Sequence, residues 1–344
     1  MAQDYRVALI AIASNEGAYL AQFVFHHLRM GFAPIILITN NSEDDTAAMA
    51  ARMAERLPGV HHLDGDPLRS RIPPADFQNS AYSLAFDLID ELQAKPDYAM
   101  FLDVDEYWVP LNGDSNVSDY IANHDAPDTL MFNWVVPDFD NTPFTIPCKA
   151  AFAGVPLKHL KTIWRYGVSL VGFNAHNVRS PELIREIVVS GMPLERRAIT
   201  IEAPVHPGSA MVIHQMYRCK TEYVAVLDRG RPSDTLIFKT NRQGYRYDLD
   251  KGSVIEIPLD PTHCRPWLSV FPAWVDDIGI RQMLVNARLN VVHRAIRADT
   301  KYESLSEEER APYANAFRFV DFDAVRAEIA ELLADPDGRI ARIP

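Results

Sequence analysis

The stretch Tyr98-Ala-Met-Phe-Leu-Asp-Val-Asp-Glu-Tyr-Trp108 decides the fold, because an apolar run ends there in a group of carboxylates. The run is short and bulky, which predicts a buried strand and not a helix. Side chains alternate along a strand, so we expect Asp103 and Asp105 to project to the same side. The repulsion of two carboxylates roughly 5–6 Å apart is on the order of 1–3 kcal/mol, and a bound divalent cation would turn it into an attraction. Carboxylate oxygens suit Mg²⁺ or Mn²⁺, although acidic pairs also simply end strands.

Units of strand, polar loop and helix precede this stretch. Apolar β-type runs alternate with segments that have a helical period, and the connections between them are short. The expected strand and helix of each unit are 7–13 and 20–28, 34–39 and 47–57, and 61–63 and 77–92. Such alternation predicts an α/β fold with a mostly parallel, Rossmann-like central sheet flanked by helices. The ligand site of such a sheet lies at the carboxyl ends of its strands.

The pattern loosens after Trp108. The expected elements are strands at 129–136, 160–164 and 211–214, helices at 222–227, 274–297 and 322–333, and an irregular, Pro-rich span at 257–272. The C-terminal third is therefore expected to be irregular and helical. Ordinary packing against the core is the simplest role for its amphipathic helices, and peripheral contact with a membrane surface is an alternative.

Composition and charge restrict the classes of function. The chain has 344 residues, of which 48% are hydrophobic and 23% charged, as is ordinary for a globular protein. Its net charge of −12 argues against a nucleic-acid-binding protein and favours a small ligand. There is no signal-peptide pattern, and no apolar run reaches the roughly 18–20 residues that span a bilayer. Cys148, Cys219 and Cys264 show neither metal-ligand spacing nor an evident disulfide pairing, which favours a reducing compartment. Together with the lack of a long apolar run, this predicts a cytoplasmic protein without a transmembrane segment.

Several motifs occur in a fixed order along the chain. They are Ile12-Ala-Ser-Asn-Glu-Gly17, Thr39-Asn-Asn-Ser-Glu-Asp-Asp-Thr46, Phe101-Leu-Asp-Val-Asp-Glu-Tyr107, Phe132-Asn-Trp134, Leu160-Lys-Thr-Ile163 and His214-Gln-Met-Tyr-Arg-Cys-Lys220. Together they resemble the bacterial branch of family 2 glycosyltransferases that is related to family 92 and has the GT-A fold. The resemblance implies a glycosyltransferase domain at 1–235, with a nucleotide-sugar half at about 1–110 and an acceptor half at about 111–235. Residues 236–344 lie outside it and would form a C-terminal helical extension.

The resemblance also implies an activity. It is a metal-dependent, inverting transfer of a sugar from a nucleoside-diphosphate sugar, such as a UDP- or GDP-sugar, to a saccharide acceptor, as in the synthesis of surface polysaccharides. Mn²⁺ or Mg²⁺ held by Asp103 and Asp105 would stabilise the departing diphosphate. His214 has the position of the family's distal histidine, which implies a third metal ligand or a diphosphate contact. A hydrogen-bonded histidine at a strand end is the alternative.

A nucleotide site follows from the same resemblance. The end of the first strand would wrap the base, and Asn40 takes the place of an acidic residue that is common in the family. Lys220 follows His214, where a cation would bind the diphosphate. For the polar loop residues, ordinary turn and capping chemistry is the alternative. The residues expected to bind the nucleotide are Ala13, Asn15, Glu16, Asn40, Asn79 and Lys220.

Inverting transfer needs a general base beside the acceptor hydroxyl. Residues 141–181 contain five Lys and Arg but no Asp or Glu, which indicates a local seat for an anion. A carboxylate base near the strand at 129–136 must therefore be Asp138 or Asp140, unless Glu182 or a later residue folds back, and we favour Asp138. Glu106 is the runner-up, although its place directly after the acidic pair favours contact with a cation.

Other classes of protein carry different expectations. A sugar nucleotidyltransferase should have a Gly-rich phosphate loop with a basic residue after the first strand, and Ser14-Asn-Glu-Gly17 is not such a loop. A haloacid-dehalogenase phosphatase has its Asp-x-Asp motif on the first strand, whereas three strands are expected before Asp103. A catalytically silent nucleotide- or sugar-binding module stays open, because Val135-Val-Pro-Asp-Phe-Asp140 stands where the family has a Phe-Gly pair.

Overall fold

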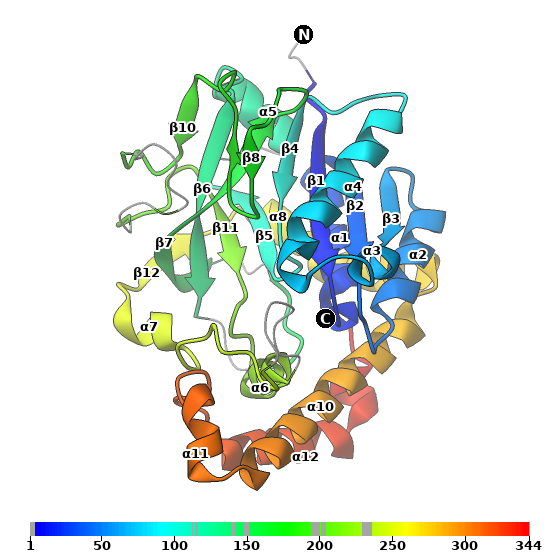
Figure 1. The fold of residues 1–344 in the computed structure, drawn as a ribbon, viewed down its shortest axis with the longest axis vertical. Coiled ribbons are helices and arrows are strands. Elements are labelled where there is room, and N and C mark those ends of the chain that lie inside the picture. Colours follow the sequence, from blue (N-terminus) through cyan, green and yellow to red (C-terminus); the bar gives the residue numbers. More distant parts are fainter. Residues whose placement is uncertain are drawn as a thin grey trace.

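The computed structural model describes residues 4–111, 113, 116–138, 142–147, 151–193, 200, 204–228 and 236–343. Helices pack on both faces of one large curled sheet (Figure 1). The strands are β1 (Val7–Ala13), β2 (Phe32–Thr39), β3 (Val60–Asp64), β4 (Tyr98–Phe101), β5 (Glu106–Pro110), β6 (Thr129–Pro137), β7 (Ala151–Arg165), β8 (Gly172–Phe173), β9 (Val178–Arg179), β10 (Glu186–Val188), β11 (Ala210–His214) and β12 (Ile255–Pro258). The α-helices are α1 (Gly17–Arg29), α2 (Thr46–Arg56), α3 (Asp66–Arg69), α4 (Phe77–Glu91), α5 (Val117–Asn123), α6 (Lys220–Leu227), α7 (Tyr247–Lys251), α8 (Pro261–Ser269), α9 (Phe271–Ile278), α10 (Arg281–Ser304), α11 (Glu307–Arg310) and α12 (Phe322–Ala334).

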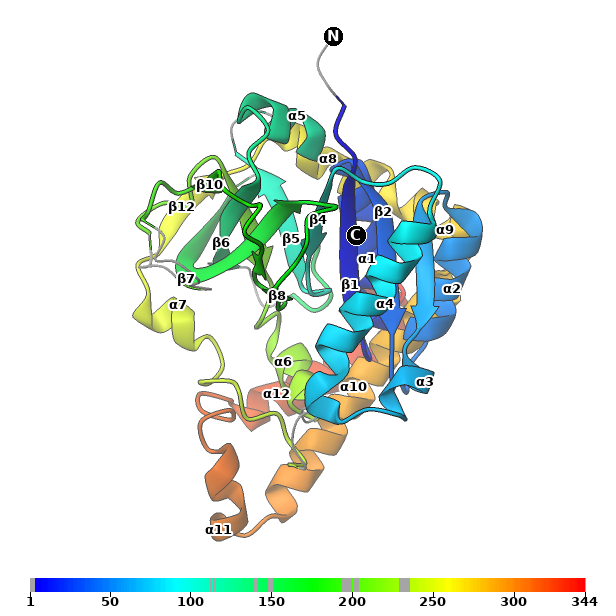
Figure 2. The same ribbon diagram turned by 45° about the horizontal axis from the view of Figure 1, so that its top comes forward.

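β1 is buried on both faces, which explains its continuous apolar sequence. Leu9 and Ala11 belong to the core formed with α1 and α2, whereas Ala8 and Ile10 belong to the core formed with α4. Figure 2 shows α4 in front of β1 and β2, with α1 behind them. The alternation of side chains along one strand therefore fills two separate layers. The predicted α/β architecture and the first three strand–helix units are confirmed.

The central sheet is mixed, and not mostly parallel as the sequence predicted. Its strand order is β3-β2-β1-β4-β7-β6-β11-β5, with β10 beside β6 and β12 beside β7. β3, β2, β1 and β4 are parallel, but β7 runs antiparallel to both β4 and β6, and β5 runs antiparallel to β11. The reason is that no helix separates β6 from β7 in the described chain, so the two strands pair without the crossover that parallel neighbours need.

The acidic pair lies in a turn and not on a strand. β4 ends at Phe101, as the fourth strand of the chain, and Val104 and Asp105 form a turn before β5. The turn is closed by Glu106, whose backbone N–H donates to the Asp103 carbonyl at 2.9 Å and whose Oε2 accepts from the Asp103 N–H at 2.8 Å. Strand alternation therefore does not place the two carboxylates, because neither aspartate lies on a strand.

The C-terminal part differs from its prediction in two places. The helix expected over 274–297 is divided into α9 and α10, because Gly279 adopts a left-handed conformation with φ 77° and ends α9. The span expected to be irregular contains α8, which Asp260 caps and Pro261 begins. α10 packs against α1 and α6, and in Figure 1 it lies with α6 near the ends of β1 and β11 at which those strands terminate. The final helix, α12, is confirmed.

Cysteine pairing differs from the sequence expectation. Cys264 is disulfide-bonded, whereas Cys219 is a free, buried thiol. The disulfide removes the support that unpaired cysteines gave to a reducing compartment.

In the part of the chain that the structure describes, no helix combines the length and apolar character needed to cross a membrane.

Candidate functional site

Asp105 and His214 come together from two distant parts of the chain. His214 is the last residue of β11 and pairs with Glu106 of β5, while the Gln215 N–H donates to the Asp105 carbonyl at 2.8 Å. The His214 Nε2 lies 3.5 Å from the Asp105 Oδ2. Burial alone would raise the pKa of Asp105. His214, together with Arg218 and Arg242, lowers this pKa by more than burial raises it, so it lies well below its usual range. Asp105 is therefore held as a carboxylate.

Asp103 faces a different cation. Its Oδ2 lies 3.4 Å from the Nζ of Lys161, which lies 2.8 Å from the Oε2 of Glu106. The side chains of Lys161 and Glu106 are fully buried, whereas that of Asp103 is 44% exposed. Burial lowers the pKa of Lys161, but Asp103 and Glu106 raise it more, so the ammonium stays charged. The sequence prediction that Glu106 contacts a cation is confirmed, and its burial sets it apart from any acceptor.

The Asp105–His214 pair fits a metal with several open positions. Two ligands about 2.1 Å from one ion and roughly 90–110° apart are separated by about 3.0–3.4 Å, close to the 3.5 Å found here. The Nδ1 of His214 is buried without a hydrogen-bond partner. Among the described residues, no group of three or more His, Cys, Asp or Glu side chains is placed to hold a metal ion. Asp103 does not complete such a group, and any ion here would take its other ligands from water or substrate, as Mg²⁺ commonly does.

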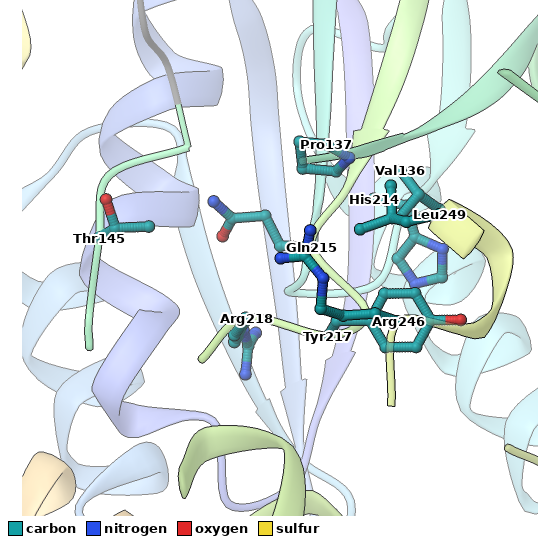
Figure 3. Close-up of a pocket in the computed structure, with 9 residues that line it drawn as sticks. All are labelled: Val136, Pro137, Thr145, His214, Gln215, Tyr217, Arg218, Arg246 and Leu249. Atoms are coloured by element: carbon teal, nitrogen blue, oxygen red, sulfur yellow. The ribbon is translucent and has the colours of Figure 1, made fainter. Parts of the chain in front are cut away.

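A small pocket with a cavity volume of about 20 Å³, open to solvent, adjoins this pair at His214. Figure 3 shows the side chains that surround it, which come from the end of β6, from Thr145, from the end of β11 and the segment after it, and from α7 with the residue before it. The two guanidinium groups of Arg218 and Arg246 belong to this lining. The lining residues are Val136, Pro137, Thr145, His214, Gln215, Tyr217, Arg218, Arg246 and Leu249.

Buried polar atoms without hydrogen-bond partners gather at this pocket. They include the Gln215 Nε2 and the Nε and one terminal nitrogen of Arg218. Beside the pocket, the ring centre of Tyr19 lies 3.3 Å from the Arg218 guanidinium carbon. Buried donors are normally satisfied, so each such atom requires an explanation. Donors on a guanidinium and an amide that face one pocket point to an anionic ligand.

The backbone is strained around the same pocket. Arg218 has φ 52° and Arg246 has φ 59°, in the left-handed region that residues other than glycine rarely adopt. Asn15 and Phe144 are also left-handed, with φ 55° and 56°. Such residues cost of order 1–3 kcal/mol each and cluster at functional sites.

The two polar loops expected to bind a nucleotide are bonded to each other. The Asn40 N–H donates to the Ala13 carbonyl at 3.0 Å, the Glu43 N–H to the Asn15 Oδ1 at 2.7 Å, and the Glu16 N–H to Thr46 Oγ1 at 2.9 Å. These contacts show that turn chemistry accounts for much of the polar sequence. Glu16 also reaches the pocket, because its Oε2 lies 3.6 Å from a terminal nitrogen of Arg218.

Two of the residues expected to bind the nucleotide, Asn79 and Lys220, lie outside the pocket lining. Asn79 is exposed in the first turn of α4, and Lys220 is the half-buried first residue of α6. Neither lines the pocket, whereas Arg218 does, two residues before Lys220.

Asp138 lies at the rim of the pocket, directly after Pro137. Its backbone N–H donates to the Ala153 carbonyl at 2.7 Å, and its carboxylate forms an ion pair with Arg246. Asp140, the other expected base, lies outside the described residues, as do Lys149, Arg229 and Arg231.

Sequence reasoning missed Arg246, Gln215, Arg218 and Tyr19. Arg218 and Gln215 were visible within the motif that begins at His214, where their donors signal an anion contact. Arg246 had no such signal, because it lies beyond the region that the motifs cover.

Comparisons of the chain with known protein families and with curated proteins find no match.

Proposed function

We propose that this protein is a metal-dependent, inverting glycosyltransferase that transfers a sugar from a nucleoside-diphosphate sugar to a saccharide acceptor. The observation that carries the proposal is the position of the Asp105–His214 pair beside a pocket whose buried Arg218 donors have no hydrogen-bond partner. A diphosphate would satisfy those donors, and it would share a divalent cation with Asp105 and His214. The sequence resemblance supports the same conclusion, with a GT-A arrangement at 1–235 and a UDP- or GDP-sugar as donor.

Each residue has a role in this proposal. Asp105 and His214 would hold Mn²⁺ or Mg²⁺, and the ion would neutralise charge on the departing diphosphate. Arg218 binds the diphosphate through N–H groups that lack a hydrogen-bond partner, although one of its terminal nitrogens also pairs with Glu16. Lys220 adds a second cation near the diphosphate. Asp138 accepts the proton of the acceptor hydroxyl as the new glycosidic bond forms.

The polar loops after β1 and β2 form the nucleoside side of the proposed site. Asn15, Glu16 and Asn40 are buried there, and the Glu16 contact with Arg218 connects this side to the diphosphate pocket. Asn79 would meet the nucleotide from α4. We place the protein in the cytoplasm, where nucleotide sugars are made, and extend the proposal to surface polysaccharide synthesis with peripheral membrane contact.

A panel of UDP- and GDP-sugars tests the proposal. Thermal shift in the presence of Mn²⁺ should reveal one nucleotide that stabilises the protein. Hydrolysis of the matching sugar nucleotide should need the metal, fall on chelation, and be abolished in Asp105→Asn. Activity that survives both chelation and the substitution would contradict the mechanism.

A nucleotide- or sugar-binding module without catalysis is the second candidate. The ion pair between Arg246 and Asp138 favours it, because the proposed base is already engaged. Binding of a nucleotide without any hydrolysis or transfer, across a broad set of acceptors, would establish this alternative.

A further inference from the structure

Arg246 stands between two anionic partners. Its side chain lines the pocket beside Arg218, and it also forms the ion pair with Asp138. The side chains of Arg246 and Asp138 are 28% and 38% exposed, so water reaches both. A solvated ion pair of this kind contributes little to stability and is easily exchanged.

The segment around Arg246 is anchored by hydrogen bonds on both sides of the arginine. Before it, the Tyr245 hydroxyl donates to the Arg218 carbonyl at 3.4 Å. After it, the Tyr217 hydroxyl donates to the Asp248 Oδ2 at 2.5 Å and accepts from the Asp248 N–H at 3.1 Å. Arg246 itself keeps a left-handed φ of 59° between these two anchors. The segment is therefore tied to the wall of the pocket on both sides of the arginine.

We propose that the Arg246 side chain leaves Asp138 and binds the diphosphate when the donor enters the pocket. We call this exchange of partners the latch. This inference rests on the proposed function. A diphosphate carries more charge than a carboxylate and offers several oxygens to a guanidinium, so it competes well for Arg246. Arg218 lies in the same lining and completes a pair of guanidinium groups around the ligand.

Release of Asp138 has a chemical consequence. The freed carboxylate takes the proton of the acceptor hydroxyl, whose oxygen forms the bond to the anomeric carbon. The bond from that carbon to the diphosphate oxygen breaks, and the diphosphate leaves with the electron pair. The base is thus unmasked only when a donor is present, which favours donor binding before acceptor binding.

The latch makes opposite predictions for its two members. With Asp138→Asn, Arg246 has no competing carboxylate, so pyrophosphate, UDP and GDP should bind with Mn²⁺ about two- to fivefold more tightly. With Arg246→Gln, the same ligands should bind roughly 10- to 100-fold more weakly. The double variant should bind like Arg246→Gln, because Asp138 acts only through the arginine.

Isothermal titration calorimetry of the full chain measures these affinities without any turnover. The matched control is the ion pair of Arg281 with Asp276, which is similarly exposed and lies between α9 and α10. Asp276→Asn should leave the affinities unchanged. Weaker binding in Asp138→Asn, or unchanged binding in Arg246→Gln, would overturn the latch while leaving the proposed function in place. If the wild type binds none of these ligands, the proposed function fails with it.

Discussion

The Nζ of Lys161 lies 2.8 Å from the Oε2 of Glu106, and neither side chain is exposed to solvent. Removing Lys161 leaves Asp103 and the buried Glu106 carboxyl without the cation that they share, at a cost of about 3–5 kcal/mol. We expect Lys161→Met to lower the free energy of unfolding by this amount. Urea denaturation measures it. Glu106→Gln should cost less, because burial raises the pKa of Glu106 well above its usual value and Asp103 also faces the ammonium.

The double variant Lys161→Met/Glu106→Gln is the control for this pair. Its loss should be clearly smaller than the sum of the two single losses, because neither buried charge is then left alone. Additive losses would contradict a direct interaction between the two residues.

Acid should destabilise the protein through His26. Burial lowers the pKa of His26 to about 4, although its ring nitrogen Nε2 bonds the Trp108 carbonyl at 2.8 Å. The unfolded chain has a histidine pKa of about 6.5, so between these values the unfolded state binds more protons and stability falls as the pH falls. For this one group the loss from pH 7 to pH 5 is about 2 kcal/mol.

The variant His26→Gln isolates this contribution. Urea denaturation at pH 7 and pH 5 should show a smaller loss in the variant than in the wild type. His293→Gln, which replaces an exposed histidine on α10, should keep the pH dependence of the wild type. An unchanged pH dependence in His26→Gln would show that other groups cause the acid sensitivity.

Helix α10 should support the loop that follows β1, the proposed nucleoside side of the site, through Arg294. This buried arginine donates to the Ala225 carbonyl at 2.6 Å and to the Asn15 carbonyl at 3.4 Å. Arg288, also buried on α10, instead donates to the carbonyls of Ile340 and Arg342 at 2.8 Å. Arg294→Met and Arg288→Met should each cost about 2–3 kcal/mol of stability, because charged hydrogen bonds are lost.

Only one of these two substitutions should affect the ligand. Calorimetry with UDP or GDP and Mn²⁺ should show weaker binding in Arg294→Met and unchanged binding in Arg288→Met. Equal binding in the two variants would show that the bond from Arg294 to the Asn15 carbonyl does not affect ligand binding.

The N-terminal half of the fold could be predicted because its signals are local. β1 and α1 follow from an apolar run and a helical period within the same twenty or so residues. The direction of β7 could not be found in this way, because it depends on which distant strands pair with it. β5 was missed for a related reason: Glu106 and Tyr107 look like the end of a strand, and only their pairing with β11 makes them the start of another.

The site shows the same limit. Asp105 and His214 could be proposed as partners from motif order, and the structure brings them together. The contact of Asp103 with Lys161 could not be foreseen, because Lys161 comes from a distant strand, β7. The role of Arg246 could not be predicted, because no local pattern in the sequence indicates that it contacts Asp138.

Asp103 and Asp105 have different partners in the structure. Because Asp103 shares its charge with Lys161 while Asp105 faces His214, the two carboxylates should differ in metal affinity. Mn²⁺ titration followed by electron paramagnetic resonance, without nucleotide, should show about 10- to 100-fold weaker binding in Asp105→Asn and His214→Gln. Asp103→Asn should lose less, and Asp323→Asn, at an exposed site on α12, should lose nothing. Equal losses in Asp103→Asn and Asp105→Asn, with none in His214→Gln, would instead place the ion between the two aspartates, as their spacing in the sequence first indicated.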